Sequence, residues 1–193
     1  DKLEDKMKLI ELCLTMAYDA KVNYADVLGS VRYWDILIYN YLREKNIVIP
    51  QKSKSEKVEK FEGAYVKDPK VGMHKWVMSF DLNSLYPHLI MQYNISPETL
   101  VPSEKKEGMV DKILAGKIRN TTDHCMTPNG AFFRKDKRGF LPEIMETMYN
   151  DRTKYKRLLL ETQQEYENTK DPKLLKDISR YNNIQMAKKI SLN

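Results

Sequence analysis

The stretch of sequence that decides the fold reads Trp76-Val-Met-Ser-Phe-Asp81-Leu-Asn-Ser-Leu-Tyr86-Pro87. Its first five residues are apolar or small, with an aromatic side chain at each end, which predicts a buried β-strand over residues 76–80. Pro87 cannot continue a central strand, so the backbone has to turn soon after Asp81. A carboxylate beside such a turn suits a hard cation such as Mg²⁺, and the N–H groups of the turn suit phosphate oxygens. For an isolated aspartate, an ordinary strand end is the preferred interpretation.

The composition is that of a globular chain with a moderate excess of basic residues. Of the 193 residues, 41% are hydrophobic and 31% are charged, and the net charge is +6. A basic balance permits a polyanionic partner without establishing one. No apolar run approaches the roughly 18 residues of a membrane span, and no secretion signal opens the chain, so we expect no membrane partner. Cys13 and Cys125 lack paired spacing, which is typical of reduced thiols in a cytoplasmic protein.

The first two thirds of the sequence contain two predicted helices, a linker and a predicted hairpin. Apolar residues at helical intervals predict one helix before about Ala20 and another over 33–45. Lys, Ser and Glu dominate residues 51–60, which predicts a flexible linker. Further along, residues 131–134 lie between two glycine-containing turns and predict a β-hairpin.

The last third of the sequence predicts two long antiparallel helices. Pro142 suits the first turn of the earlier helix, and the break at 168–172 offers Asp171 as the N-cap of the next. The expected fold class is therefore α+β. We expect N-terminal helices in 1–52, part of a mixed sheet in 53–140, and a helical hairpin in 141–193.

Basic residues recur at helical spacing in both of these helices. Arg152 and Lys156 are four apart, and Gln185, Lys189 and Asn193 repeat that interval, so each set shares one helix face. Facing one cleft, the two sets would suit a triphosphate, whose transfer depends on positioning and on neutralising charge. With 33 Lys and Arg in the chain, such pairs also arise by chance on solvated helices, and spacing alone favours that simpler interpretation.

Four stretches resemble family B DNA polymerases, and the resemblance as a whole extends over nearly the whole chain, from the helices before residues 51–60 to the last residue. Residues 81–87 resemble the first catalytic motif, D-x-x-S-L-Y-P. Residues 94–99 and 150–156 resemble the T-even-like bacteriophage members, and 185–193 resemble the second motif, K-x-x-x-N-S-x-Y-G, as far as its asparagine. The resemblance implies a palm sheet in 53–140, a fingers hairpin in 141–193, and two-metal phosphoryl transfer from a deoxynucleotide to a primer 3′ end.

The resemblance also implies roles for individual residues. Asp81 would bind both Mg²⁺ ions, and the Leu82 carbonyl would bind the nucleotide-associated one. Tyr86 would lie under the sugar and exclude a 2′-hydroxyl. The residues expected to hold the triphosphate are Ser84, Leu85, Tyr86, Arg152, Lys156, Lys189 and Asn193. A weaker match to the Y-x-G-G/A element, with Gly63 and Ala64 as its small residues, implies a contact with template backbone.

A two-metal site needs a second carboxylate, which the family takes from a D-T-D motif that this sequence lacks. The sequence therefore predicts part of a polymerase, truncated, split or intein-interrupted after Asn193, that does not polymerise DNA alone. The expected partners are primer-template DNA and a dNTP. By resemblance they include a sliding clamp and a single-stranded-DNA-binding protein, and a second polymerase chain if the gene is split.

Two other interpretations compete with this one. A non-catalytic basic helical domain that binds nucleic acid or a protein would leave the seven-residue motif unexplained. It predicts that Asp81→Ala does not alter metal or nucleotide binding. A protein-primed polymerase of the same family would share the first motif but should carry insertions around the palm, and none is evident.

Overall fold

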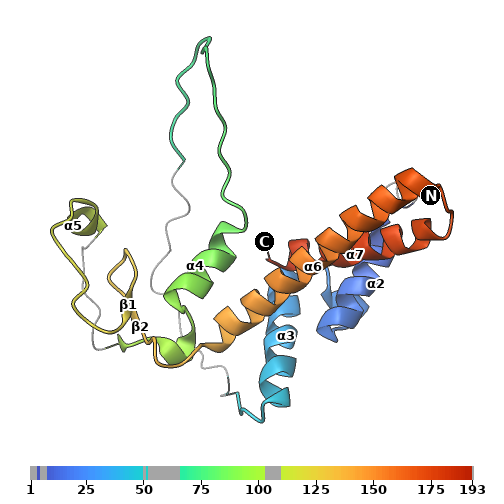
Figure 1. The fold of residues 1–193 in the computed structure, drawn as a ribbon. Coiled ribbons are helices and arrows are strands. Elements are labelled where there is room, and N and C mark those ends of the chain that lie inside the picture. Colours follow the sequence, from blue (N-terminus) through green and yellow to red (C-terminus); the bar gives the residue numbers. More distant parts are fainter. Residues whose placement is uncertain (1–3, 5–7, 50, 52–65, 103–109, 193) are drawn as a thin grey trace.

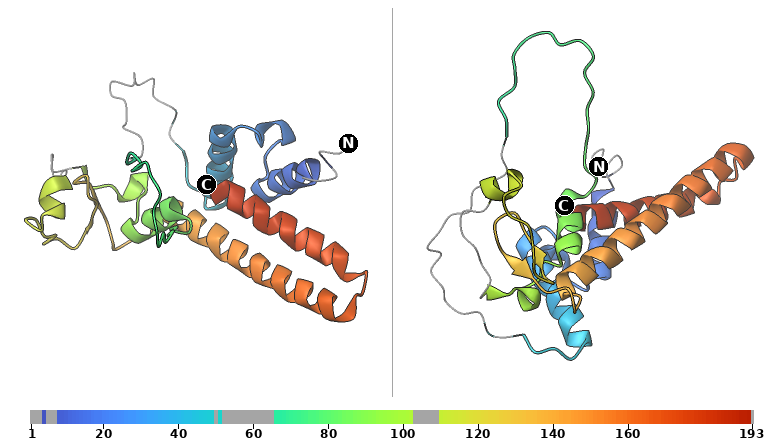
Figure 2. Two further views of the ribbon diagram at one scale, coloured as in Figure 1. Left: turned by 90° about the horizontal axis from the view of Figure 1, so that it is seen from above. Right: turned by 60° about the vertical axis from the view of Figure 1, so that its left-hand side comes forward.

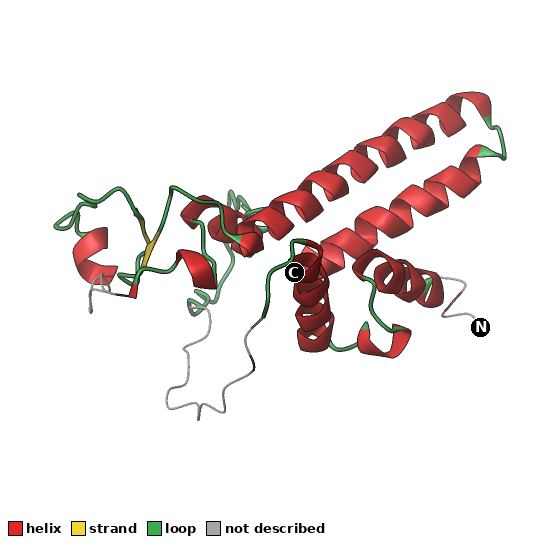
Figure 3. Ribbon diagram, turned by 90° about the horizontal axis from the view of Figure 1, so that it is seen from below, coloured by secondary structure: helices red, strands yellow, loops and turns green. Residues whose placement is uncertain are grey.

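The computed structural model describes residues 4, 8–49, 51, 66–102 and 110–192, and helices dominate this part of the chain (Figures 1 and 3). In chain order the elements are α2 (Leu9–Ala20), η1 (Tyr24–Asp26), α3 (Ser30–Glu44), α4 (Leu85–Tyr93), η2 (Pro97–Thr99), α5 (Val110–Leu114), β1 (Cys125–Met126), β2 (Phe132–Phe133), α6 (Phe140–Thr169) and α7 (Leu174–Leu192).

Helices α6 and α7 form the long antiparallel hairpin that the sequence predicts (Figure 2). The turn between them begins at Lys170, whose φ of 53° ends α6 in the left-handed conformation. Asp171 then accepts a hydrogen bond from the N–H of Lys173 through Oδ1 at 2.9 Å. Because α7 begins at Leu174, two residues after the start that the sequence predicts, this contact orders the turn just before the helix.

The N-terminal helices pack against the base of this hairpin. One core cluster joins Met16 and Ala20 of α2 to Tyr33 of α3 and Ala187 of α7. A second cluster combines Ile144, Met145, Met148 and Leu192 of the hairpin with half-buried side chains of α3 and α4. Residues from all three parts of the sequence thus share the core, and the division of domains at residues 52 and 140 stays a prediction.

The predicted hairpin around residues 131–134 is confirmed. Strands β1 and β2 pair antiparallel, with Cys125 opposite Phe133 and Met126 opposite Phe132. Phe132 is only 1% exposed. Thr127 and Gly130 close the turn, and the Gly130 φ of 82° lies in the region that glycine adopts without strain. Helices with a small antiparallel sheet agree with an α+β class.

The prediction of a buried strand over residues 76–80 is wrong for this structure. Residues 66–82 contain no strand and form an open loop (Figure 1). Trp76 is 98% exposed, with a φ of 59° that no extended strand has. Apolar alternation indicates a face that a sheet could bury, but a strand also needs a neighbour for its backbone groups. In the part of the chain that the structure describes, β1 and β2 pair only with each other and with Leu100.

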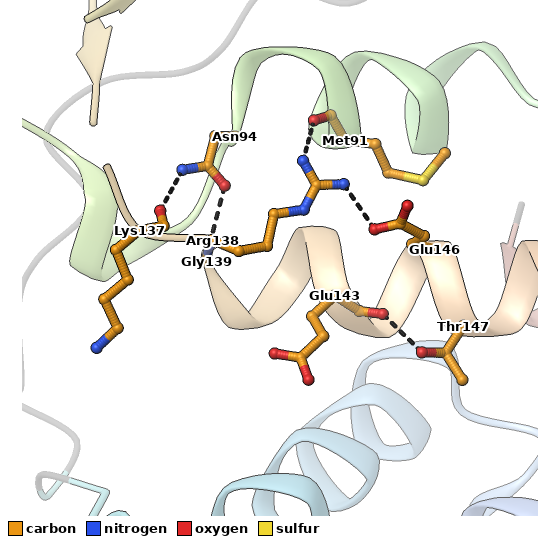
Figure 4. Close-up of polar contacts among 8 residues, drawn as sticks. All are labelled: Met91, Asn94, Lys137, Arg138, Gly139, Glu143, Glu146 and Thr147. Carbon is orange, nitrogen blue, oxygen red and sulfur yellow. Dashed lines mark hydrogen bonds and ion pairs between the residues drawn. The ribbon is translucent and has the colours of Figure 1, made fainter. Parts of the chain in front are cut away.

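The end of α4 is fixed to the start of α6 by a buried asparagine (Figure 4). Asn94 is 6% exposed, and its side-chain amide donates to the carbonyls of Arg134 and Lys137 at 2.6 and 2.8 Å. Its Oδ1 accepts from the N–H of Gly139 at 2.9 Å. Arg138 adds a second link, because it donates to the carbonyl of Met91 at 2.8 Å and to Glu146 at 2.9 Å. These contacts set the position of α4 along α6.

We expect Asn94→Ala to lower the free energy of unfolding by about 2–4 kcal/mol, because it leaves one buried N–H and two part-buried carbonyls without their partner. Urea denaturation followed by circular dichroism would measure the change. Asn40→Ala is the matched control, since Asn40 is half-buried and donates over 3.2 and 3.3 Å to Ala20 and Lys21. Equal losses in the two variants would contradict a special role for Asn94.

Candidate functional site

The N-terminus of α4 has the features of an anion site. Ser84 precedes the helix in a left-handed conformation, with φ 51° and ψ 50°, and its hydroxyl does not cap the helix. Within the described residues, no hydrogen bond uses the N–H groups of Leu85 and Tyr86. Unpaired N–H groups and the positive end of the helix dipole both favour a negatively charged ligand.

Helix α4 lies antiparallel to the first half of α6, which brings an arginine to this N-terminus. His88 contacts Tyr149 edge to face, with ring centroids 4.7 Å apart. One turn further along α6, Arg152 donates from Nη1 to the Ser84 hydroxyl at 3.2 Å. The spacing of three residues between 149 and 152 places both side chains on the α6 face that covers α4. The structure thus joins two residues that the sequence assigned to one ligand.

The guanidinium of Arg152 has one hydrogen-bond donor without a partner among the described residues. Its Nε is buried and makes no hydrogen bond with any described residue. An unpaired buried donor costs about 1–3 kcal/mol, and that cost disappears when a ligand or water accepts from it. An arginine can also donate two parallel hydrogen bonds to two oxygens of one phosphate, which a lysine cannot do. Arg152 is therefore suited to hold an oxyanion at the start of α4.

The other residues predicted to contact the nucleotide or the template differ in how close they lie to Ser84 and Arg152. Tyr86, in the first turn of α4, is 66% exposed. Lys156 follows Arg152 by one turn and is exposed. Lys189 is exposed on α7, and no hydrogen bond or ion pair joins it to α4 in the described part of the chain. Gly63, Ala64 and Asn193 lie outside the described residues, so their predicted roles stay predictions.

The metal site expected at Asp81 is chemically suitable but incomplete. Asp81 and Leu82 are exposed in the loop that leads into α4, and their carboxylate and carbonyl oxygens are ligands that Mg²⁺ prefers. No group of three or more His, Cys, Asp or Glu side chains gathers at one point within the described residues. Further ligands would have to come from a substrate phosphate or from a second carboxylate.

Sequence reasoning missed a charged cluster at the base of the hairpin. Lys188 of α7 is 8% exposed, and its Nζ lies 2.7 Å from Asp19 of α2 and 3.4 Å from Asp151 of α6. The sequence does contain a pattern that indicates a buried lysine. Ile184, Lys188 and Leu192 are spaced by four, which places the lysine in a row of apolar residues.

The fold has a counterpart among solved structures. The structure matches that of the family B DNA polymerase from the hyperthermophilic archaeon Pyrobaculum calidifontis, with a TM-score of 0.67 and 21% identity. The match covers 98% of this chain and 22% of that one. The chain thus shares its fold with part of that polymerase.

The family follows from the sequence. The model of DNA polymerase family B matches residues 29–193. The chain is 38% identical to the DNA-directed DNA polymerase of Escherichia phage RB69 over 170 residues, 88% of this chain and 19% of that protein. It is 34% identical to the DNA-directed DNA polymerase of Enterobacteria phage T4 over 79% of its own length and 17% of the relative's. The chain belongs to DNA polymerase family B, and it spans about a fifth of the length of these two relatives.

None of the described helices is both long and apolar enough to cross a membrane.

Proposed function

We propose that this chain supplies part of the nucleotide site of a DNA-directed DNA polymerase that extends primer 3′ ends during phage DNA replication. Membership of family B and similarity to two phage DNA polymerases support the activity. The arrangement that we infer is the one the motifs predict. A palm segment carries Asp81 and the start of α4, and a fingers hairpin, α6 and α7, carries the basic residues.

The observation that carries this proposal is the contact between Arg152 and Ser84. The serine belongs to the D-x-x-S-L-Y-P motif, and the arginine lies 68 positions further along the chain. Ser84 immediately precedes Leu85 and Tyr86, whose N–H groups make no hydrogen bond within the described residues, and this supports a shared anion site. Guanidinium and backbone N–H donors both bind phosphate oxygens, and a positioned set of them stabilises the charge that develops during phosphoryl transfer.

Each residue has a distinct part in this mechanism. Arg152, Lys156 and Lys189 bind and orient the triphosphate, Asn193 adds an amide, and the ring of Tyr86 lies against the deoxyribose where a 2′-hydroxyl would project. Asp81 and the Leu82 carbonyl would hold Mg²⁺, which when bound neutralises phosphate charge and activates the primer oxygen. Gly63 and Ala64 would allow the template backbone to approach closely.

The proposed partners follow from this activity. The chain would work with primer-template DNA and dNTPs, together with a sliding clamp and a single-stranded-DNA-binding protein, in the cytoplasm of the host cell. The second active-site carboxylate would come from polymerase sequence that these 193 residues do not contain.

A binding measurement tests the proposal on the chain itself. We expect Arg152→Ala to weaken binding of a Mg²⁺-dNTP complex by about tenfold or more, the loss of at least one charge-assisted hydrogen bond. Isothermal titration calorimetry would report the change. Arg157→Ala is the matched control, because Arg157 lies on the same helix, is 74% exposed, and pairs with Glu161 instead. We expect its affinity to equal that of the unsubstituted chain.

Two results would count against the proposal. One is equal dNTP affinity in Arg152→Ala and Arg157→Ala. The other is DNA binding without any measurable dNTP binding, which would favour the non-catalytic basic domain.

A further inference from the structure

The buried lysine of α7 joins three helices at the base of the hairpin. The side chain of Lys188 is 10% exposed, whereas those of Asp19 and Asp151 are 37% and 42% exposed. Both carboxylates line a groove of about 720 Å³ between α2, α6 and α7. Lys188 lines the same groove, but its side chain has less contact with water than those of the two aspartates. A buried charge is tolerated only with such partners, because an unpaired one loses its hydration without compensation.

The ammonium group stays charged in this position. Burial by itself lowers the pKa of Lys188, but the hydrogen bond that Lys188 donates to Asp19 and the charges of Asp19 and Asp151 outweigh burial and raise the pKa overall. Among the described residues of α7, the buried ones are Ala187, Lys188, Ser191 and Leu192, so Lys188 is the charged member of the face that packs inward.

The cluster is adjacent in sequence to two of the proposed triphosphate ligands. Lys188 precedes Lys189, and Asp151 precedes Arg152. Successive residues on an α-helix point about 100° apart. Fixing residue 188 inward therefore fixes the direction in which residue 189 leaves α7, and fixing residue 151 does the same for residue 152 on α6. The ion pairs hold the two helices in one rotational setting relative to each other.

A second contact holds α7 in the same setting. The Tyr33 hydroxyl of α3 lies 2.9 Å from the Ser191 hydroxyl, and both groups are buried. Ser191 in turn donates to the Ala187 carbonyl at 2.9 Å. These contacts anchor the inner face of α7 to the N-terminal helices, and Lys189 is left on the exposed side.

We propose that Lys188, held by Asp19 and Asp151, is a positioning residue of the nucleotide site that orients Lys189 and Arg152 toward the triphosphate. The inference rests on the proposed function, because it assumes that these two residues bind the nucleotide. Lys188 itself need not touch the ligand. The N-terminal helices gain a role in nucleotide binding that the polymerase motifs do not assign to them.

The test measures Mg²⁺-dNTP affinity in variants of position 188. Lys188→Met keeps the length of the side chain and removes its charge, and we expect it to weaken binding by about tenfold. Lys188→Arg keeps the charge and should restore affinity to within about threefold of the unsubstituted chain. Lys176→Met, at an exposed lysine of the same helix, should leave affinity unchanged. Retained affinity in Lys188→Met would overturn the proposal.

A mutant cycle separates positioning from a loss of stability. If Lys188 acts through its two neighbours, Lys188→Met added to a chain that already carries Lys189→Met and Arg152→Ala should weaken binding by no more than about twofold. Additive losses would show that Lys188 acts by another route and would overturn the proposal. Should Lys188→Met fail to fold, Asp151→Asn carries the same cycle against Arg152→Ala, because it removes one charge and keeps the shape of the side chain.

The outcomes also distinguish this inference from the proposed function. If Lys189→Met and Arg152→Ala bind the nucleotide normally, the proposed function fails, and this inference fails with it. If they bind weakly while Lys188→Met and Asp151→Asn bind normally, only the positioning role is overturned.

Discussion

Replacing Asp81 by alanine should reduce kcat for nucleotide addition by at least about 10³-fold, because it removes the carboxylate that we propose as a ligand of the catalytic metal ions. The measurement needs a complete polymerase. A suitable one is a chimera in which this segment replaces the matching stretch of the phage RB69 enzyme, with which it shares 38% identity. Single-turnover primer extension would report kcat, and titration with Mg²⁺ would report whether more metal is needed.

Asp68→Ala is the matched control for this prediction, because Asp68 is an exposed aspartate of the same loop. We expect that variant to extend primers at the rate of the unsubstituted chimera. A kcat within tenfold of normal in Asp81→Ala would refute its assignment as a metal ligand. The isolated 193-residue chain should show no template-dependent incorporation in either form, and incorporation by it would overturn the prediction that the reaction needs a further carboxylate from a D-T-D motif.

Replacing Tyr86 by alanine should lower the discrimination against ribonucleotides by about 10²-fold or more. The expected effect comes from shape, because a bulky ring rejects a hydroxyl by collision, whereas an open pocket rejects an added hydroxyl poorly. Tyr86 is 66% exposed at the first turn of α4, so truncation of its side chain leaves the core intact. The quantity to measure is the ratio of kcat/KM for dNTP and rNTP in the same chimera.

Tyr86→Phe provides the control, since it retains the ring and loses only the hydroxyl. A steric role predicts normal discrimination in Tyr86→Phe together with lost discrimination in Tyr86→Ala. Discrimination that survives in both variants would contradict that role, and discrimination lost in both would assign it to the phenolic hydroxyl.

The helices were predictable because their signals are local. The break before Asp171 and the turn contact to Lys173 depend on residues within one turn of each other, and so does the glycine turn between β1 and β2. Boundaries moved by a few residues. The helix expected over 33–45 begins at Ser30, and α6 begins at Phe140, before the proline that suited its first turn.

The strand over residues 76–80 could not be decided locally. Its apolar pattern describes a surface that can be buried, whereas strand formation also requires a hydrogen-bonding partner from elsewhere in the sequence. The candidate site likewise combines features that are local in sequence with contacts between distant residues. The motif at residues 81–87 and the spacing of Arg152 were visible in the sequence, and their meeting at Ser84 needed the packing of α4 on α6. The pairing of Lys188 with Asp19 joins residues 169 positions apart, which no local pattern encodes.

The open loop has a consequence for the behaviour of the chain in solution. Residues 76–80 form an uncharged, β-prone run whose Trp76 and Phe80 side chains are 98% and 85% exposed, the kind of segment that seeds intermolecular β-structure. Lys75 and Asp81 flank the run and act as charged gatekeepers against such stacking. Asp81 thus also contributes to colloidal stability. An alanine at this position lengthens the uncharged stretch, so the soluble concentration of that variant would fall together with its turnover.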